Sequence, residues 1–385
     1  MDFDTDAAAP RRGTGTSRVG SGPGPRRASA GNDAPTDPGR DIDRGRRRGR
    51  DVVMTDVAMA AGVSHMTVSR VLNGSANVSP HTRQRVEAAL SELGYRPNLA
   101  ARALVTGRSR QLAVVSFDTT LYGPASTLFA IEQAARKEDY SVSIVSLGAL
   151  DREGITEAVN RLRSQAVDGA VIVAPHVSAR EALLAVPADL PTVVVGGAGI
   201  ESLPLVALDQ EAGARVATEH LLALGHRTVW HVAGPDDWVD GQGRLRGWKR
   251  ALQRAGAPVP KPLPGDWSAQ SGYAAGQRLA EAHHRAPDEV TAVFVANDHM
   301  ALGLLRALRE ADLRTPADIS LVGFDDVPET PYFPPPLTTI RQDFSMVGTH
   351  SLQLLLRRIN GVVTPVRTIL EPQLIVRQST AGPRS

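Results

Sequence analysis

From residue 111 onward, short apolar runs alternate with amphipathic stretches. The amphipathic stretches show helical spacing and cover 125–138, 155–165, 210–224, 243–255, 271–282 and 298–311. The apolar runs cover 112–117, 142–145, 170–173, 192–195, 228–232, 292–295 and 319–322. Runs that are apolar throughout are typical of parallel strands covered by helices on both faces, so the pattern predicts an α/β fold. There are too many strands for one small sheet, which indicates two lobes.

A different pattern, of short helices with capping signals, precedes these strands. Each of three helical runs between residues 54 and 93 opens on a hydroxyl side chain and closes on a glycine. The opening residues are Thr55, Ser64 and Ser79, and the closing residues are Gly62, Gly74 and Gly94. Apolar residues recur at helical spacing and suffice for one small core: Val57, Ala58, Ala61, Val63, Val68, Val71, Leu72, Val86, Ala89, Leu90 and Leu93.

The first two of these runs predict a helix-turn-helix, with Gly62 in the turn. On the second helix, polar and exposed positions face away from the apolar ones, and such a helix can enter the major groove of DNA. There Arg70 can bind guanine through two hydrogen bonds, His65 can donate or accept, and Met66 can pack on a thymine methyl, with Ser69 on the same face. The alternative is the solvated polar face of an ordinary three-helix bundle.

Charge is distributed unevenly along the 385 residues, although the formal net charge is only +2. Residues 1–50 carry +4, residues 51–110 carry +3, and residues 111–385 carry −5. The first fifty residues are rich in Gly, Pro, Ser, Arg and Asp, so we expect a disordered tail. Its arginine run at 44–50 either contacts DNA phosphate or is merely solvated. The asymmetry places DNA binding at the N-terminal end.

Several function classes are excluded by composition. The chain has no cysteine, which rules out disulfides, thiolate nucleophiles and Cys-ligated metals. The glycines at 241 and 243 do not complete a dinucleotide fingerprint, because Arg246 stands where the third glycine belongs. We expect no enzyme activity, no catalytic or metal-binding residue and no cofactor. Without an apolar signal segment or a run of about 18 apolar residues, we expect a cytoplasmic protein that does not span a membrane.

The N-terminal motifs resemble those of the LacI/GalR family of bacterial transcription regulators. The matching stretches are 53–58, 62–73, 78–79 and 94–98. The resemblance implies a DNA-binding domain at 51–96 and places His65, Met66 and Arg70 at base-contacting positions. It extends the expected DNA-contacting set to Thr55, Ser64, Thr67, Ser69, Asn73 and Asn98.

Residues 97–110 correspond in the family to a hinge helix and linker. Their Ala/Leu/Arg composition allows a helix, but the segment is too short to be helical alone in water. The resemblance implies that two such helices pair in the minor groove, that Leu104 wedges into the central base step, and that Ala101 lies alongside. The alternative for Leu104 is a buried linker residue.

Residues 111–380 resemble the family's effector-binding and dimerisation core, which is similar to periplasmic sugar-binding proteins. We expect lobe one at 111–208 plus 338–380 and lobe two at 209–337, with the ligand between them. Open α/β sheets bind ligands beyond the carboxyl ends of their strands, which makes the strand-end residues candidates: Asp118, Asn297, Asp298, Asp325 and Asp326.

Sugar recognition needs carboxylates, amides, a guanidinium and an apolar face. The resemblance implies that Asn297, Asp325 and Gln342 hydrogen-bond a sugar and that Arg244 donates two hydrogen bonds to its hydroxyls. It also implies that Trp267 and Phe344 pack against the apolar face of the sugar, and that Leu121 and Pro124 form an apolar wall of the site. Gly196 stands where a sugar-responsive family member has a pocket aspartate, and Asp240 where it has a serine. Simpler roles remain open: helix caps for Asn297 and Asp325, core packing for Trp267 and a surface ion pair for Arg244.

These observations predict a repressor of sugar-utilisation genes that a sugar, most simply a galactoside, releases from a pseudo-palindromic operator. A purine-responsive regulator that needs a corepressor is the alternative. A secreted sugar-binding protein and a Rossmann-type enzyme are less consistent with the motifs. Because the chain stops soon after Thr380, where a family member continues into a leucine-heptad tetramerisation helix, we expect a homodimer.

Overall fold

The computed structural model describes residues 52–72, 74–75, 77–95, 107–117, 119–148, 151–197, 199–362 and 367–384. The chain divides after residue 96 into two compact units. The predicted tail at 1–50 and the predicted hinge helix, with Ala101 and Leu104, lie outside the described residues, as do Asn73, Asn98 and Asp118.

Three helices make up the described part of the N-terminal unit: α1 (Met54–Ala61), α2 (His65–Leu72) and α3 (Pro80–Glu92). The turn after α1 depends on Gly62, whose φ of +61° suits glycine, and it places the N–H of Val63 3.0 Å from the carbonyl of Ala58. The prediction that Thr55 caps α1 is wrong. The cap is Val53, two residues earlier, and the Asp56 carboxylate accepts the N–H of Val53 at 2.9 Å.

The core of this unit is the one that helical spacing predicts. Its buried residues are Val57, Ala58, Ala61, Val68, Val71, Val86 and Ala89, and the other predicted residues pack against them. Ser64 and Ser79 cap α2 and α3, each accepting a backbone N–H three residues later at 3.2 Å. The Arg85 guanidinium donates to the carbonyls of Ala61 and Gly62 and so ties α3 to the turn between α1 and α2.

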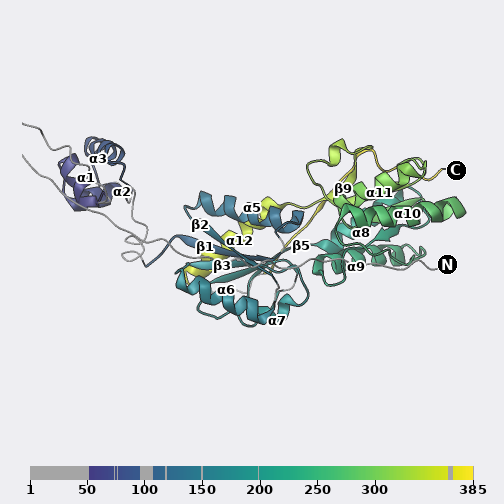
Figure 1. The fold of residues 1–385 in the computed structure, drawn as a ribbon, viewed down its shortest axis with the longest axis horizontal. Coiled ribbons are helices and arrows are strands. Elements are labelled where there is room, and N and C mark those ends of the chain that lie inside the picture. The colour runs from purple at the N-terminus through teal and green to yellow at the C-terminus, as the bar shows by residue number, and fades with distance from the viewer. Residues whose placement is uncertain are drawn as a thin grey trace, which may run out of the picture. The chain divides into compact units, whose positions relative to one another are not determined.

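The larger unit contains two sheets, as the alternating pattern predicts (Figure 1). The first sheet is entirely parallel, in the order β10-β5-β4-β3-β1-β2. Its strands are β1 (Gln111–Phe117), β2 (Ser141–Leu147), β3 (Gly169–Val173), β4 (Thr192–Val195), β5 (Leu205–Leu208) and β10 (Arg367–Leu370). Helices α5 (Tyr122–Lys137) and α12 (Phe344–Ile359) pack on one face, and α6 (Arg152–Ser164) and α7 (Ala179–Leu183) on the other. This body is lobe one.

The second sheet has the order β11-β9-β8-β7-β6 and is parallel except for β11. Its strands are β6 (Trp230–Val232), β7 (Ala292–Val295), β8 (Ser320–Asp325), β9 (Thr338–Arg341) and β11 (Gln373–Ile375). Helices α8 (Gln210–Ala223) and α9 (Val239–Arg254) cover one face, and α10 (Ala269–Arg285) and α11 (Asp298–Glu310) the other. Short 3-10 turns, η1 (Pro287–Glu289) and η2 (Thr330–Tyr332), complete this body, which is lobe two.

The predicted boundary between the lobes is wrong at the C-terminal end. Residues 338–380 do not all return to lobe one, because β9 and β11 extend the sheet of lobe two, and only α12 and β10 belong to lobe one. Ile340 of β9 is buried in the core of lobe two. The chain therefore crosses between the lobes near residue 209, at 342–343 and at 371–372.

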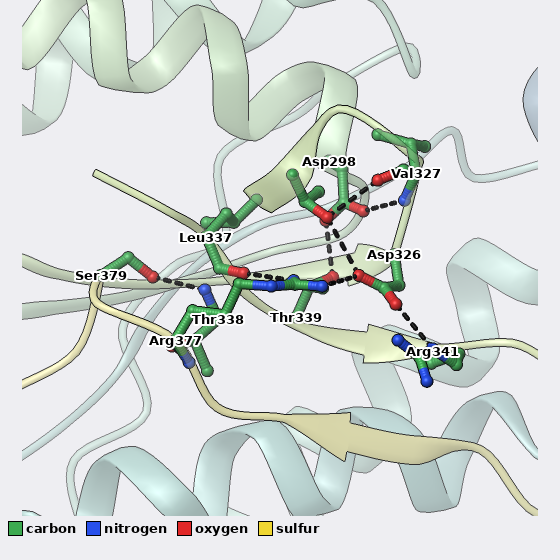
Figure 2. A network of polar contacts seen from close by, with 10 residues as sticks. Asp298, Asp326, Val327, Leu337, Thr338, Thr339, Arg341, Arg377 and Ser379 are labelled. Atoms are coloured by element: carbon green, nitrogen blue, oxygen red, sulfur yellow. Dashed lines mark hydrogen bonds and ion pairs between the residues drawn. The ribbon is translucent and has the colours of Figure 1, made fainter. Parts of the chain in front are cut away.

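Two acidic residues that follow β7 and β8 join neighbouring segments of lobe two, and Asp326 also holds the C-terminal segment through Arg377 (Figure 2). The buried Asp298 carboxylate accepts the N–H of Val327 at 3.0 Å and the hydroxyl of Thr339 at 2.6 Å. Asp326 pairs with Arg341 at 2.6 Å and with Arg377 at 2.7 Å. Burial alone would raise the pKa of Asp326, but hydrogen bonds from these two guanidinium groups bring it below its usual range.

Glycines allow α8 and α9 to pack closely. A Cβ at Gly247 would lie 2.2 Å from the carbonyl oxygen of Glu211 and 2.9 Å from the Cβ of Ala214. A Cβ at Gly243 would lie 2.8 Å from that of Gln210. The glycine pattern of α9, which fails as a dinucleotide fingerprint, thus brings the start of α8 close to α9.

Replacing Gly247 with alanine should therefore destabilise the protein by about 1–3 kcal/mol, because backbone atoms must move to admit the methyl group. Gly123→Ala is the matched control: this glycine lies in α5 with nothing within 4 Å of an added Cβ, so alanine should be neutral or stabilise by up to about 1 kcal/mol. Urea unfolding followed by circular dichroism measures both. Equal stability of the two variants would contradict the packing role.

Candidate functional site

The outer face of α2 presents the side chains predicted to contact DNA. His65, Met66 and Arg70 are exposed, and Met66, at 62% exposure, is a large apolar side chain in an otherwise polar face. Ser64 and Thr67 hydrogen-bond each other at 2.9 Å while Ser64 caps the helix. The buried Val68 and Val71 anchor the opposite face, so the helix is amphipathic as predicted. The individual DNA contacts remain predictions.

A cleft between the two sheets contains nine of the ten predicted ligand-binding residues. It encloses about 1140 Å³, part of which is continuous with solvent. It lies where strands of both sheets end, since Val173, Val195 and Leu208 close three strands of lobe one and Asp325 closes β8. The predicted residues that line it are Leu121, Pro124, Asp240, Arg244, Trp267, Asn297, Asp325, Gln342 and Phe344. The tenth, Asp118, lies outside the described residues.

Arg244 is the central charged group of the cleft. Its side chain is only 4% exposed, which is inconsistent with a surface ion pair. Its Nε donates to Oε1 of Gln210 at 2.9 Å, its Nη1 donates to the carbonyl of Ala296, and its Nη2 lies 3.3 Å from Oδ1 of Asp325. The guanidinium carbon is 3.9 Å from the ring centre of Phe324 and 5.2 Å from that of Trp267. Ion pairing, hydrogen bonds and aromatic rings together stabilise this buried cation.

Two glutamines connect Arg244 to Asp325 by a second route. Nε2 of Gln210 donates to Oε1 of Gln342 at 2.9 Å, and Nε2 of Gln342 donates to Oδ1 of Asp325 at 2.7 Å. The four side chains therefore form a closed ring, which we call the cleft ring. Oδ2 of Asp325 takes no hydrogen bond from the described part of the chain, and this oxygen can accept a ligand hydroxyl.

Asp240 places a second carboxylate one helical turn before Arg244, on the same face of α9. It lines the cleft and takes no hydrogen bond from any described residue. Burial raises its pKa, and the nearby Arg244 opposes the shift. Burial likewise raises the pKa of Asp325, to about 6, although Arg244 and Gln342 favour the charged form. Arg244 thus pairs with the carboxylate of Asp325 and acts on that of Asp240 only through its charge.

The backbone is unusual at two of the lining residues. Asp325 has a φ of 112° and Trp267 a φ of 72°, both in the region that side chains rarely adopt. The Trp267 carbonyl accepts Nδ2 of Asn297 at 3.0 Å, while Oδ1 of Asn297 caps α11 by accepting the N–H of Met300 at 2.9 Å. Asn297 is therefore both a helix cap and a cleft residue, and Trp267 belongs both to the core and to the cleft.

The two walls of the cleft differ in polarity. Lobe one contributes no charged side chain among the described residues and mostly apolar ones, such as Pro175, Val195 and Val347. Gly196 has a φ of +106°, and a Cβ there would lie 3.0 Å from the carbonyl oxygen of Ala174, so side chains other than glycine are strained at this position. Among the described residues, the charged groups of the cleft come from lobe two.

Among the cleft residues that sequence reasoning missed are Tyr122, Gln210, Trp238 and His299. Gln210 lies two residues after the end of β5, a four-residue strand that the apolar pattern did not reveal, so residues near this strand end were not considered as candidates. Conversely, the strand-end rule proposed Asp298 and Asp326, which do not line the cleft. Burial and the nearby Asp325 carboxylate raise the pKa of Asp298 well above its usual range, and its oxygens are taken by Val327 and Thr339.

Comparison with known proteins supports both parts of this description. The model of the bacterial regulatory proteins of the lacI family matches residues 53–98, and that of a periplasmic binding protein-like domain matches residues 218–380. The lactose operon repressor of Escherichia coli K12 is 36% identical over 338 residues, covering 87% of this chain and 92% of that protein. The chain belongs to the lacI family.

Further similarities agree with this membership. The transcriptional regulator CelR of Thermobifida fusca is 38% identical over 345 residues, covering 86% of this chain and 99% of that protein. A crystal structure of the lac repressor dimer bound to operator and the anti-inducer ONPF has a TM-score of 0.74 at 36% identity, covering 86% of this chain and all of that one. A CelR–cellobiose complex has a TM-score of 0.62 at 35% identity, covering 85% and 99%.

The family membership makes the chain a transcriptional regulator with a helix-turn-helix DNA-binding domain, and the relatives named are regulators, not enzymes. Within the described residues, no helix is both long and apolar enough to cross a membrane, and no group of three or more His, Asp or Glu could hold a metal ion.

The raised pKa of Asp325 predicts a pH-dependent stability. The folded carboxyl has a pKa of about 6, against a usual value of 3.8, so between these values the folded protein binds a proton that the unfolded chain releases. This contribution is present at low pH and is lost as the pH rises through about 6. Relative to Asp325→Asn, the wild type should therefore gain about 1 kcal/mol in unfolding free energy when the pH falls from 7.5 to 5. Urea titrations of both proteins test this, and a difference independent of pH would contradict it.

Proposed function

We propose that the chain is a homodimeric repressor of sugar-utilisation genes that binds a pseudo-palindromic operator and leaves it when a sugar inducer enters the cleft. The inducer would be a galactoside or a related β-linked oligosaccharide. The observation that carries this proposal is the cleft ring, in which a buried guanidinium, a carboxylate and two amides face one cavity beside aromatic rings.

The chemistry of the cleft fits a hydroxyl-rich ring. Arg244 keeps N–H groups beyond the three that contact Gln210, Ala296 and Asp325, and these can donate to neighbouring hydroxyls. Oδ2 of Asp325 and the carboxylate of Asp240 can accept hydroxyl protons. Trp267 and Phe344 can lie against the apolar face of the ring.

The named relatives support the choice of sugar. One is a lactose operon repressor, and CelR has been crystallised with cellobiose; both lactose and cellobiose are β-linked disaccharides. A charged side chain at position 196 of lobe one would be strained, whereas lobe two supplies the carboxylate of Asp240. Among the described residues, the charged groups available for recognition therefore lie on lobe two. We infer that the sugar's hydroxyl pattern is read mainly by lobe two.

The DNA-binding half of the proposal rests on the exposed face of α2 and on the dimeric lac repressor–operator complex among the similar structures. Two α2 helices, one from each protomer, would read the two half-sites. The set that we propose to contact DNA includes Thr55, Ser64, His65, Met66, Thr67, Ser69, Arg70 and Asn73. Asn98, Ala101 and Leu104 would act in the minor groove, where Leu104 would unstack the central step.

Sugar recognition can be tested with a matched pair of variants. Arg244→Lys removes the planar fork in the cleft, whereas Arg246→Lys changes an exposed arginine on the same helix that pairs with Glu211. We expect Arg244→Lys to weaken inducer binding at least tenfold, about 1.4 kcal/mol, and Arg246→Lys to leave it unchanged. Operator duplexes selected from a random-sequence library allow release to be followed by fluorescence anisotropy.

The ligand panel for this assay should contain lactose, isopropyl thiogalactoside, cellobiose, hypoxanthine and guanine. Release by a β-linked sugar supports the proposal. Tighter operator binding with a purine, and no response to any sugar, would replace the inducer with a corepressor. Equal effects of the two arginine variants would contradict the role of Arg244.

Base readout can be tested separately. Arg70→Ala should weaken operator binding by about 1–3 kcal/mol and relax the preference at one base position of each half-site, while binding to non-operator DNA changes little. Affinities for a set of single-base operator variants give this answer at fixed salt concentration. An unchanged base preference would show that α2 docks differently.

A further inference from the structure

The cleft ring has only one consistent direction. The Nε of Arg244 can only donate a hydrogen bond, and an ionised Asp325 can only accept one. Gln210 must therefore turn its side-chain oxygen to Arg244 and its nitrogen to Gln342. Gln342 must in turn direct its oxygen to Gln210 and its nitrogen to Asp325, and the structure has both orientations. Rotating either amide by half a turn would bring two donors or two acceptors together. Each member of the ring thus fixes the orientation of the next.

The two glutamines of the ring stand at two different crossings between the lobes. Gln210 follows Asp209, where the chain first leaves lobe one, and begins α8. Gln342 precedes Asp343, which caps α12 by accepting the N–H of Met346 at 3.0 Å as the chain returns to lobe one. The 2.9 Å bond between the two amides therefore joins two crossings through buried side chains.

Gln210 is held in place from three sides. Its residue is 8% exposed, Asp209 caps the helix that it begins by accepting the N–H of Ala212 at 2.8 Å, and Gly243 leaves the space that its Cβ occupies. Because α8 packs closely on α9, Gln210 is fixed relative to Arg244, which α9 carries. A change at Arg244 is therefore transmitted to a rigid neighbour.

We propose that Gln210 is a positioning residue that couples occupancy of the cleft to the movement of the lobes; the coupling rests on the proposed sugar response. A sugar that binds the remaining N–H groups of Arg244 or Oδ2 of Asp325 attracts the same two side chains that the ring holds, and so changes the geometry of the ring. The ring then favours one geometry of the crossings at 209 and 342–343 over another. A ligand shifts such an equilibrium only through a difference in affinity for the two geometries, and the ring supplies that difference.

Two substitutions of Gln210 separate its two contacts. Gln210→Ala removes both. Gln210→Glu keeps an oxygen for Arg244 but has no N–H for Gln342, so it should break only the link to the second crossing. Gln242→Ala is the matched control, because this glutamine lies on α9 and its amide donates to the carbonyl of Asp236 at 2.9 Å, outside the ring. Thermal unfolding of each variant verifies that it folds.

The first measurement needs no ligand. Hydrogen–deuterium exchange of the full chain reports on residues 344–347, where the N–H groups of Phe344, Met346 and Val347 bond to Gln342 and Asp343. We expect exchange in this segment to rise several-fold in Gln210→Ala and in Gln210→Glu, and to stay unchanged in Gln242→Ala. Unchanged exchange in both Gln210 variants would overturn the proposal.

The second measurement uses operator release by the sugar that acts on the wild type. The affinity of Gln210→Glu for the sugar should stay within about threefold of the wild-type value, but the sugar should weaken its operator binding about tenfold less than it does in the wild type. In Gln210→Ala, both the affinity for the sugar and the sugar's effect on operator binding should fall. Full release in Gln210→Glu would overturn the coupling. If no sugar releases the wild type, the proposed inducer class fails, and the exchange measurement still decides whether Gln210 holds the two crossings together.

Discussion

The ligand cleft depends on the burial of one positive charge. A guanidinium that leaves water must be paired and hydrogen-bonded, or its desolvation would destabilise the fold. Asp325, Gln210 and the carbonyl of Ala296 meet this requirement for Arg244, and Phe324 and Trp267 lie close to its carbon. The same groups are then in place for a polar ligand. The requirement for stability and the requirement for recognition thus select the same side chains.

The strand-end geometry explains why residues so far apart in sequence meet in this cleft. Parallel strands end at one edge of each sheet, and the three crossings set the two edges opposite each other. The unusual backbone of Asp325 at the end of β8 fits this position, where the strand must turn while its carboxylate stays beside Arg244. Glycines at 243 and 247 complete the arrangement, because α9 can carry Arg244 to the start of α8 only if the helices pack closely.

Much of this could be predicted from the sequence, and the failures have physical causes. Long buried strands and amphipathic helices have strong patterns, and motif resemblance identified nine cleft residues. The strands β5, β9 and β11 have only three or four residues, and β9 and β11 include polar ones, so the search for apolar runs did not reveal them; the lobe boundary was therefore misplaced and Gln210 was missed. Asp298 and Asp325 look alike in sequence, since each is an acid at a strand end. They differ because Thr339 and Val327 satisfy the carboxylate of Asp298.

The unequal walls of the cleft give the two lobes different energetic roles. Hydrogen bonds and ion pairs depend on direction, so the charged groups of lobe two can distinguish one hydroxyl pattern from another. Apolar contacts are nearly independent of direction and grow with the area removed from water, so the wall around Val195 and Val347 can favour closure over any ligand of suitable size. Lobe two would then recognise which ligand is bound, and the apolar wall of lobe one would favour closure of the cleft around it. The crossings joined by Gln210 and Gln342 lie where these two effects combine.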